Sequence, residues 1–151
     1  MVRNGTMETM KMRTMKGMKS DDSAMGKESV LKIDRDCHVD HAWMLDQVSV
    51  IKAVCRLKSV DVTKVEMAHT KKGQHFYIEI KPTVSAHLAN RLQYLLGDDC
   101  RRVDYNRARI RSKYPDWNKL FEPIGQRLQT LYPIKVPAGT RKTKKGGNSP
   151  S

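Results

Sequence analysis

The sequence predicts a single α+β domain, and three observations lead to this fold class. Residues 65–81 alternate between apolar and polar side chains on both sides of a short basic turn, as a β-hairpin does. Residues 42–56 and 83–96 carry apolar side chains at helical spacing instead. A further strand is predicted from residue 30 onward. The expected order is strand, helix, strand, strand, helix, with the two helices backing a sheet.

The second strand of the hairpin separates its residues onto two faces. Phe76, Ile78 and Ile80 lie on one face, which we predict to be turned toward the core. His75 and Tyr77 then stand on the opposite, more exposed face, where any chemistry would take place.

The turn of the hairpin consists of Thr70, Lys71, Lys72 and Gly73. We expect Gly73 to adopt the positive φ that closes a short connection between twisted strands.

Capping residues define where the predicted helices begin and end. Asp40 is suited to the N-cap of helix 42–56. Pro82 suits the first turn of helix 83–96, and Gly97 suits its C-terminal end. A third helix is expected from residue 100 to about residue 114, capped by Asp98 or Asp99.

The remainder of the chain shows weaker patterns. Residues 117–121 fit a short strand or a docking segment, and residues 125–132 fit a last short helix. Residues 1–29 are rich in methionine and residues 133–151 are basic; we predict that both segments are disordered. The predicted domain therefore covers residues 30–132.

Charge predicts the kind of partner. The 151 residues carry a formal net charge of +13, and part of this excess lies in segments predicted to be ordered. Such a balance favours a polyanion, DNA or RNA. No apolar run is long enough to span a membrane. Three cysteines without a CxxC pair or a secretory signal favour a reducing, cytoplasmic location.

Two carboxylates stand close together at the end of the first strand. Asp34 and Asp36 are two positions apart and so project from the same face. Like charges at this spacing are costly, which leaves three interpretations: a metal site, a neighbouring basic side chain, or exposure to water at the strand end.

The third predicted helix is rich in arginine, at positions 101, 102, 109 and 111. Guanidinium groups on a helix with few apolar residues commonly contact phosphates. The alternative is a solvated helix in which Arg101, Arg102, Arg109 and Arg111 pair with nearby aspartates.

These motifs, IDRD on a strand, TKKGQH entering a strand and VD before an arginine-rich stretch, resemble the archaeo-eukaryotic primase and primase-polymerase superfamily. The resemblance implies a sheet like that of the RNA-recognition motif, acidic residues that bind divalent metal, and a histidine that contacts nucleotide phosphate. The matching positions are Asp34 and Asp36, then Thr70, Gly73 and His75, and finally Asp104. The stretches GDDCRRVDYNRAR and WNKLF also resemble small uncharacterised phage and archaeal proteins.

Two main functions follow as hypotheses. A binding module would use Lys71, Lys72, Tyr77 and the four arginines to hold a nucleic acid strand, with Tyr77 stacking on a base. A metal-dependent nucleotidyltransferase would use Asp34, Asp36, His75 and Asp104 with Mg²⁺ or Mn²⁺. A basic structural protein without a site is a further alternative.

Overall fold

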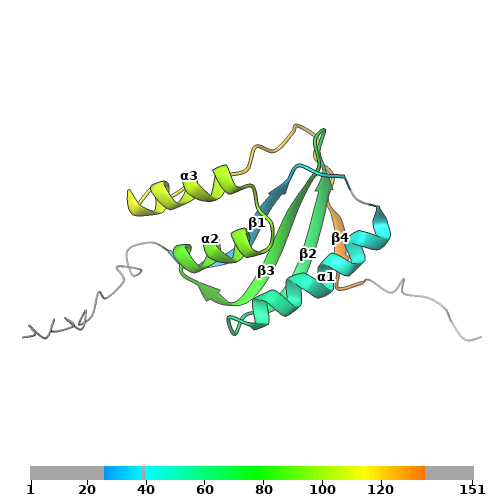
Figure 1. Cartoon of the computed structure of the whole chain (residues 1–151), viewed down its shortest axis with the longest axis horizontal. Helices are drawn as coiled ribbons and strands as arrows, with labels where there is room; N and C mark the ends of the chain where they lie inside the picture. Colours follow the sequence, from blue (N-terminus) through cyan, green and yellow to red (C-terminus); the bar gives the residue numbers. More distant parts are fainter. Residues whose placement is uncertain (1–25, 39, 135–151) are drawn as a thin grey trace, which may run out of the picture.

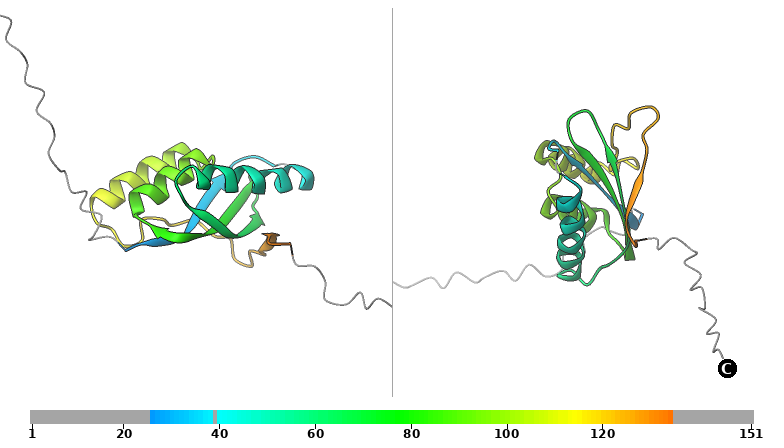
Figure 2. Two further views of the ribbon diagram at one scale, coloured as in Figure 1. Left: turned by 90° about the horizontal axis from the view of Figure 1, so that it is seen from below. Right: turned by 90° about the vertical axis from the view of Figure 1, so that its right-hand side faces the viewer.

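The computed structural model describes residues 26–38 and 40–134. Within these residues, an antiparallel sheet of four strands is covered on one face by helices, as the side views show (Figures 1 and 2). The strands are β1 Glu28–Arg35, β2 Asp61–His69, β3 Gln74–Val84 and β4 Gln129–Tyr132. The helices are α1 His41–Arg56, α2 Ala86–Leu95 and α3 Cys100–Arg111.

The strand order in the sheet is β1-β3-β2-β4. The β2–β3 hairpin forms its centre, and β1 pairs with the other side of β3. The short β4 pairs with β2 and forms an edge of the sheet. The α+β class is therefore confirmed, whereas the closer likeness to an RNA-recognition motif stays a prediction.

The core lies between the sheet and the helices. Phe76, Ile78 and Ile80 of β3 are buried as expected, together with Leu31 and Ile33 of β1. They pack against the apolar stripes of α1 and α2, which the helical periodicity predicted. Each such side chain adds roughly 1.5–3 kcal/mol to stability when removed from water.

Capping side chains begin all three helices, and those of α1 and α3 are the expected ones. Asp40 accepts a hydrogen bond from the backbone N–H of Trp43, and Asp99 accepts one from that of Arg102. Ser85 is the N-cap of α2, and Pro82 lies in the last part of β3 instead of the first turn of this helix. The predicted start of this helix at residue 83 was therefore too early.

Two further expectations need correction, and one pair of alternatives is decided. Residues 129–132 form strand β4, not part of a helix, because Leu131 is buried in the core and the segment pairs with β2. For residues 117–121 the docking segment, one of the two alternatives, is the one observed, with Trp117 and Leu120 as its buried side chains. Strand β1 begins at Glu28, two residues before the predicted start at residue 30. Most of the two segments predicted to be disordered, residues 1–25 and 135–151, lies outside the described residues.

Gly73 is required for a different reason from the one expected. Among the described glycines, positive φ occurs at Gly97 and Gly125, not at Gly73. A Cβ atom on Gly73 would lie 1.8 Å from the backbone oxygen of Arg35. The close approach of the hairpin turn to the end of β1 therefore demands glycine.

The free edge of β1 is closed by the end of α2 and by the segment that joins α2 and α3. The backbone N–H groups of Lys32 and Asp34 donate to side-chain oxygens of Gln93 (3.0 Å) and Asp98 (2.8 Å). The N–H of Asp99 donates to the carbonyl oxygen of Asp34 at 3.2 Å. These contacts satisfy an otherwise unpaired strand edge and hold α3 beside the carboxylates of β1.

Candidate nucleic-acid interface

The end of β1 and the hairpin turn meet at one hollow of about 250 Å³, the first hollow. Asp34 and His75 are cross-strand neighbours in the β1–β3 pairing. Their side chains approach to 3.4 Å between Asp34 Oδ1 and His75 Nε2. The residues that line this hollow are Asp34, Asp36, Thr70, Lys71, Lys72, His75, Phe121 and Pro123. The two best-defined sequence motifs therefore come together in space.

Burial controls the electrostatics of Asp34. Loss of water around its carboxyl group raises its pKa above the usual value, although His75 and Arg102 act in the opposite direction. Asp36 adds to the rise by like-charge repulsion. Asp36 itself is exposed at the strand end, beyond the last paired residue of β1. The repulsion between Asp34 and Asp36 is thus offset by the attraction of Asp34 to His75 and Arg102 and by the exposure of Asp36 to water.

The helix-free face of the sheet is less open here than the sequence indicated. The segment between α3 and β4 crosses it, so that His75 is only 5% exposed. Nδ1 of His75 lies 3.2 Å from Oε1 of Gln126. The Tyr77 hydroxyl donates to Glu122 and accepts from Gln126 Nε2, both at 2.8 Å. Burial is the main cause that raises the pKa of Tyr77 to about 12. Its hydroxyl is thus held under this segment, which limits the access of Tyr77 to a base.

A second hollow of about 210 Å³ adjoins the first. It is lined by Asp34, Asp99, Arg101, Arg102, Tyr105, Arg109, Lys119, Leu120 and Phe121. Arg101 and Lys119 are exposed at its rim, and Arg109 is half-buried. Asp34 and Phe121 line both hollows, so the two form one continuous surface.

Arg102 lines the second hollow, but its guanidinium is occupied by contacts within the protein. Its guanidinium forms an ion pair with Asp98, whose side chain is fully buried. It also donates to the carbonyl oxygen of Lys32 at 2.9 Å and to Asn118 Oδ1 at 2.7 Å. Burial raises the pKa of Asp98 despite this pairing. Arg102 is therefore committed to joining α3, β1 and the segment that follows α3.

Two aromatic residues were not identified as functional from the sequence. Phe121 is 93% exposed where the two hollows join, and Tyr105 is 66% exposed in the second hollow. Because Trp117 and Leu120 are buried anchors, Phe121 is left outside the core. The signal that identifies such a residue is an exposed aromatic side chain next to lysines and arginines. This exposure depends on the fold and cannot be read from the sequence.

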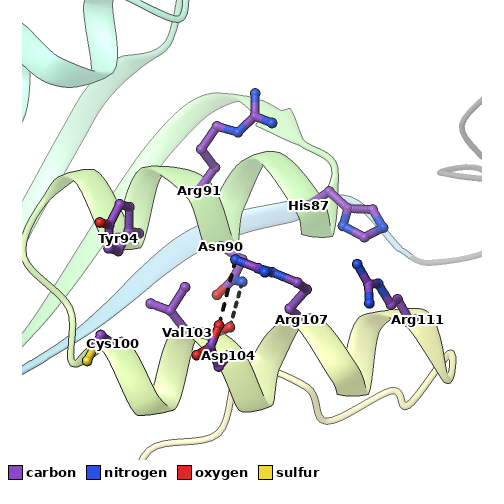
Figure 3. A pocket seen from close by; sticks show the side chains of 9 residues that line it. All are labelled: His87, Asn90, Arg91, Tyr94, Cys100, Val103, Asp104, Arg107 and Arg111. Carbon is purple, nitrogen blue, oxygen red and sulfur yellow. Dashed lines mark hydrogen bonds and ion pairs between the residues drawn. The ribbon is translucent and has the colours of Figure 1, made fainter.

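Two predicted site residues lie elsewhere. Asp104 is on helix α3, where its Oδ1 is 3.7 Å from a guanidinium nitrogen of Arg107. Asp104 and Arg111 line a different pocket, between α2 and α3 (Figure 3). Asp104 is thus not among the residues that surround Asp34, Asp36 and His75.

The carboxylates do not make a complete metal site by themselves. Among the described residues, no group of three or more His, Cys, Asp or Glu side chains is arranged to hold a metal ion. Asp34 is already in contact with His75, and the third carboxylate implied by the resemblance, that of Asp104, is directed to another pocket. A divalent ion there would have Asp34 and Asp36 as its protein ligands, and Mg²⁺ is commonly held by one or two carboxylates together with substrate phosphates.

Comparison with known proteins finds no match among family models, curated proteins or solved structures. Within the described part of the chain, none of the helices combines the length and the apolar character needed to cross a bilayer.

Proposed function

We propose that this protein binds single-stranded nucleic acid across the two joined hollows. The observation that carries the proposal is the position of Phe121, which is 93% exposed between a lysine-lined and an arginine-lined hollow. Aromatic side chains beside basic groups are the usual platform for unpaired bases, because every base offers a face for stacking.

The basic groups at the rims would contact the backbone of the strand. Lys71 and Lys72 are exposed on one side of Phe121, and Arg101 and Lys119 are exposed on the other. A strand that stacks a base on Phe121 would therefore meet cations in both directions. Asp36, exposed in the first hollow, supplies an acceptor for an exocyclic amino group of a base.

The test is fluorescence anisotropy with a labelled oligonucleotide, single-stranded and then annealed to its complement, at low salt. Phe121→Ala is expected to weaken single-strand binding by roughly 5- to 150-fold, the usual cost of losing one stacked base. Ile124→Ala is the matched control, because Ile124 is also a fully exposed apolar residue of the same segment but lines neither hollow. Equal affinities of the two variants, or tighter binding of the duplex, would refute the proposal.

The second candidate is a metal-dependent nucleotidyltransferase, and one observation favours it. Asp34, Asp36 and His75 line the same hollow as Lys71 and Lys72, which could hold a triphosphate. The exposed Phe121 beside the same lysines is a stacking platform for a base and favours binding without catalysis.

Thermal melting with and without Mn²⁺ separates the two candidates. An ion bound at one hundred times its dissociation constant would stabilise the wild-type protein by about 2.7 kcal/mol. If the protein is an enzyme, the Asp34→Asn/Asp36→Asn variant should lose the stabilisation by Mn²⁺, whereas the control Asp104→Asn should keep it. The binding proposal expects the same Mn²⁺ shift in all three proteins and no nucleotide incorporation on a primed template.

A further inference from the structure

A pocket of about 570 Å³ lies between α2 and α3, with a lining separate from that of the two hollows (Figure 3). Its size falls within the range of small-molecule sites. Its wall consists of side chains from both helices, and Asn90 and Val103 supply the deeper part.

The pocket has a strong excess of positive charge. Arg91, Arg107 and Arg111 line it, whereas Asp104 is its only carboxylate. A carboxylate oxygen of Asp104 lies 3.7 Å from a guanidinium nitrogen of Arg107, and the guanidinium of Arg111 has no hydrogen bond or ion pair with another described residue. Figure 3 shows Arg107 and Arg111 rising from α3 toward α2, with His87 near Arg111. With three arginines and one carboxylate among its described lining residues, the pocket carries an excess of positive charge that favours an anion, and phosphate in particular.

Buried amides hold the two helices at a defined separation beneath the pocket. Asn90 Nδ2 donates to the carbonyl oxygen of Val103 at 3.0 Å, and Asn106 Nδ2 donates to Asn90 Oδ1 at 3.3 Å. Both asparagines are buried. The arginines of α3 are therefore placed opposite α2 before any ligand arrives, which lowers the cost of ordering them on binding.

An aromatic side chain stands at the other end of the pocket. Tyr94 is 58% exposed and follows His87 by seven residues on α2, about 10 Å along the helix axis. In Figure 3 it lies at the end opposite His87 and Arg111. The pocket thus offers an aromatic surface at one end and cations at the other.

We propose that this pocket binds a nucleotide, with its phosphates at Arg107 and Arg111 and its base against Tyr94. A nucleotide has the required elongated shape, with an aromatic ring at one end and two or more negative charges at the other. The inference does not depend on the nucleic-acid interface, because a different set of residues lines this pocket.

The experiment is isothermal titration of the full-length protein at low salt with ADP and, separately, with pyrophosphate. Arg107→Gln/Arg111→Gln should weaken both ligands by about tenfold or more, since it removes two charge-assisted contacts. Tyr94→Ala should weaken ADP by several-fold and leave pyrophosphate unchanged. All three side chains are exposed, so these variants are expected to fold.

The matched control is Arg56→Gln/Lys58→Gln, which removes the same charge from two exposed residues that line neither this pocket nor the two hollows. It should bind ADP like the wild-type protein. Equal losses in the two double variants would show that only overall charge matters and would overturn the proposal. Absence of any heat with millimolar ADP, or equal wild-type affinity for ADP and pyrophosphate, would overturn the assignment of a nucleotide.

Discussion

The first hollow can form because residue 73 is a glycine and has no side chain. The backbone N–H of Gly73 donates to Thr70 Oγ1 at 3.0 Å, and its carbonyl oxygen accepts from the N–H of Thr70 at 2.9 Å. A Cβ atom there would meet the backbone oxygen of Arg35 at 1.8 Å and the backbone nitrogen of Cys37 at 2.7 Å. The turn can approach β1 only because residue 73 has no Cβ atom. This approach brings Lys71 and Lys72 beside the carboxylates of Asp34 and Asp36.

Gly73→Ala is accordingly expected to lower the free energy of unfolding by roughly 1–3 kcal/mol, the cost of overpacking against a backbone that cannot yield easily. Urea denaturation measures this loss. Gly26→Ala is the control, since a Cβ atom at Gly26 meets nothing within 4 Å. A Gly73→Ala protein as stable as this control would show that the turn can move away from β1.

Asp34 links pH to stability at the residue scale. Burial raises its pKa in the folded protein, so folding favours the protonated form. A raised carboxyl pKa gives stability that is complete below the unfolded pKa and is lost as pH rises through the folded pKa. At neutral pH the ionised Asp34 therefore imposes a cost on the folded state.

Asp34→Asn should remove that cost and raise the melting temperature at pH 7, with a gain that shrinks as the pH approaches 4. The side chain is 34% exposed, so solvent screening limits the gain to about 1 kcal/mol or less. Melting curves at the two pH values, with Asp104→Asn as an exposed control, provide the measurement. A lower melting temperature for Asp34→Asn at pH 7 would mean that the contact with His75 outweighs burial.

At the scale of elements, Arg102 connects three segments that are distant in the sequence. It joins α3 to β1 through the carbonyl oxygen of Lys32, and to the segment after α3 through Asn118. Gln93 of α2 exchanges two hydrogen bonds with Asn118, at 2.9 and 3.0 Å. This polar network closes the edge of β1 and gives the second hollow a fixed wall.

Arg102→Gln should destabilise the fold by about 3–5 kcal/mol, because it leaves the buried Asp98 carboxylate without its partner. Adding Asp98→Asn should recover part of the loss, since the unpaired charge is then absent. Chemical denaturation of the single and double variants tests this. Arg101→Gln, on the exposed side of α3, should change stability by no more than about 0.5 kcal/mol. Similar small effects for both arginines would contradict a structural role for Arg102.

At the scale of the whole molecule, the net charge of +13 predicts binding that depends on salt. Residues 140–151 contribute Arg141, Lys142, Lys144 and Lys145 without any acidic residue. Electrostatic attraction from this segment carries no information about bases, whereas stacking on Phe121 depends on an unpaired strand.

Deletion of residues 140–151 should weaken binding to all oligonucleotides alike and reduce the slope of log K against log salt by up to about 3, for four charges on a single strand. The loss caused by Phe121→Ala should persist in the shortened protein. Anisotropy titrations between 50 and 200 mM salt are suited to this comparison, because the effect is large in that range. An unchanged slope would show that the segment does not contact the nucleic acid.

The elements with strong periodicity could be predicted from the sequence because burial of one face imposes a local pattern. Phe76, Ile78 and Ile80 indicated the core face of β3, and Asp40 indicated the start of α1. In each case the relevant residues lie within a short stretch whose side chains alternate or recur.

The remaining features depend on contacts between distant segments, which no local pattern records. Residues 129–132 became a strand because β2 offered an unpaired edge, and Arg102 became structural because Asp98 is buried beside it. Phe121 is exposed at the join of the two hollows only because its neighbours are anchored in the core. The sequence by itself therefore determined the α+β class and the main elements, whereas tertiary packing decided which charged and aromatic side chains are available to a ligand.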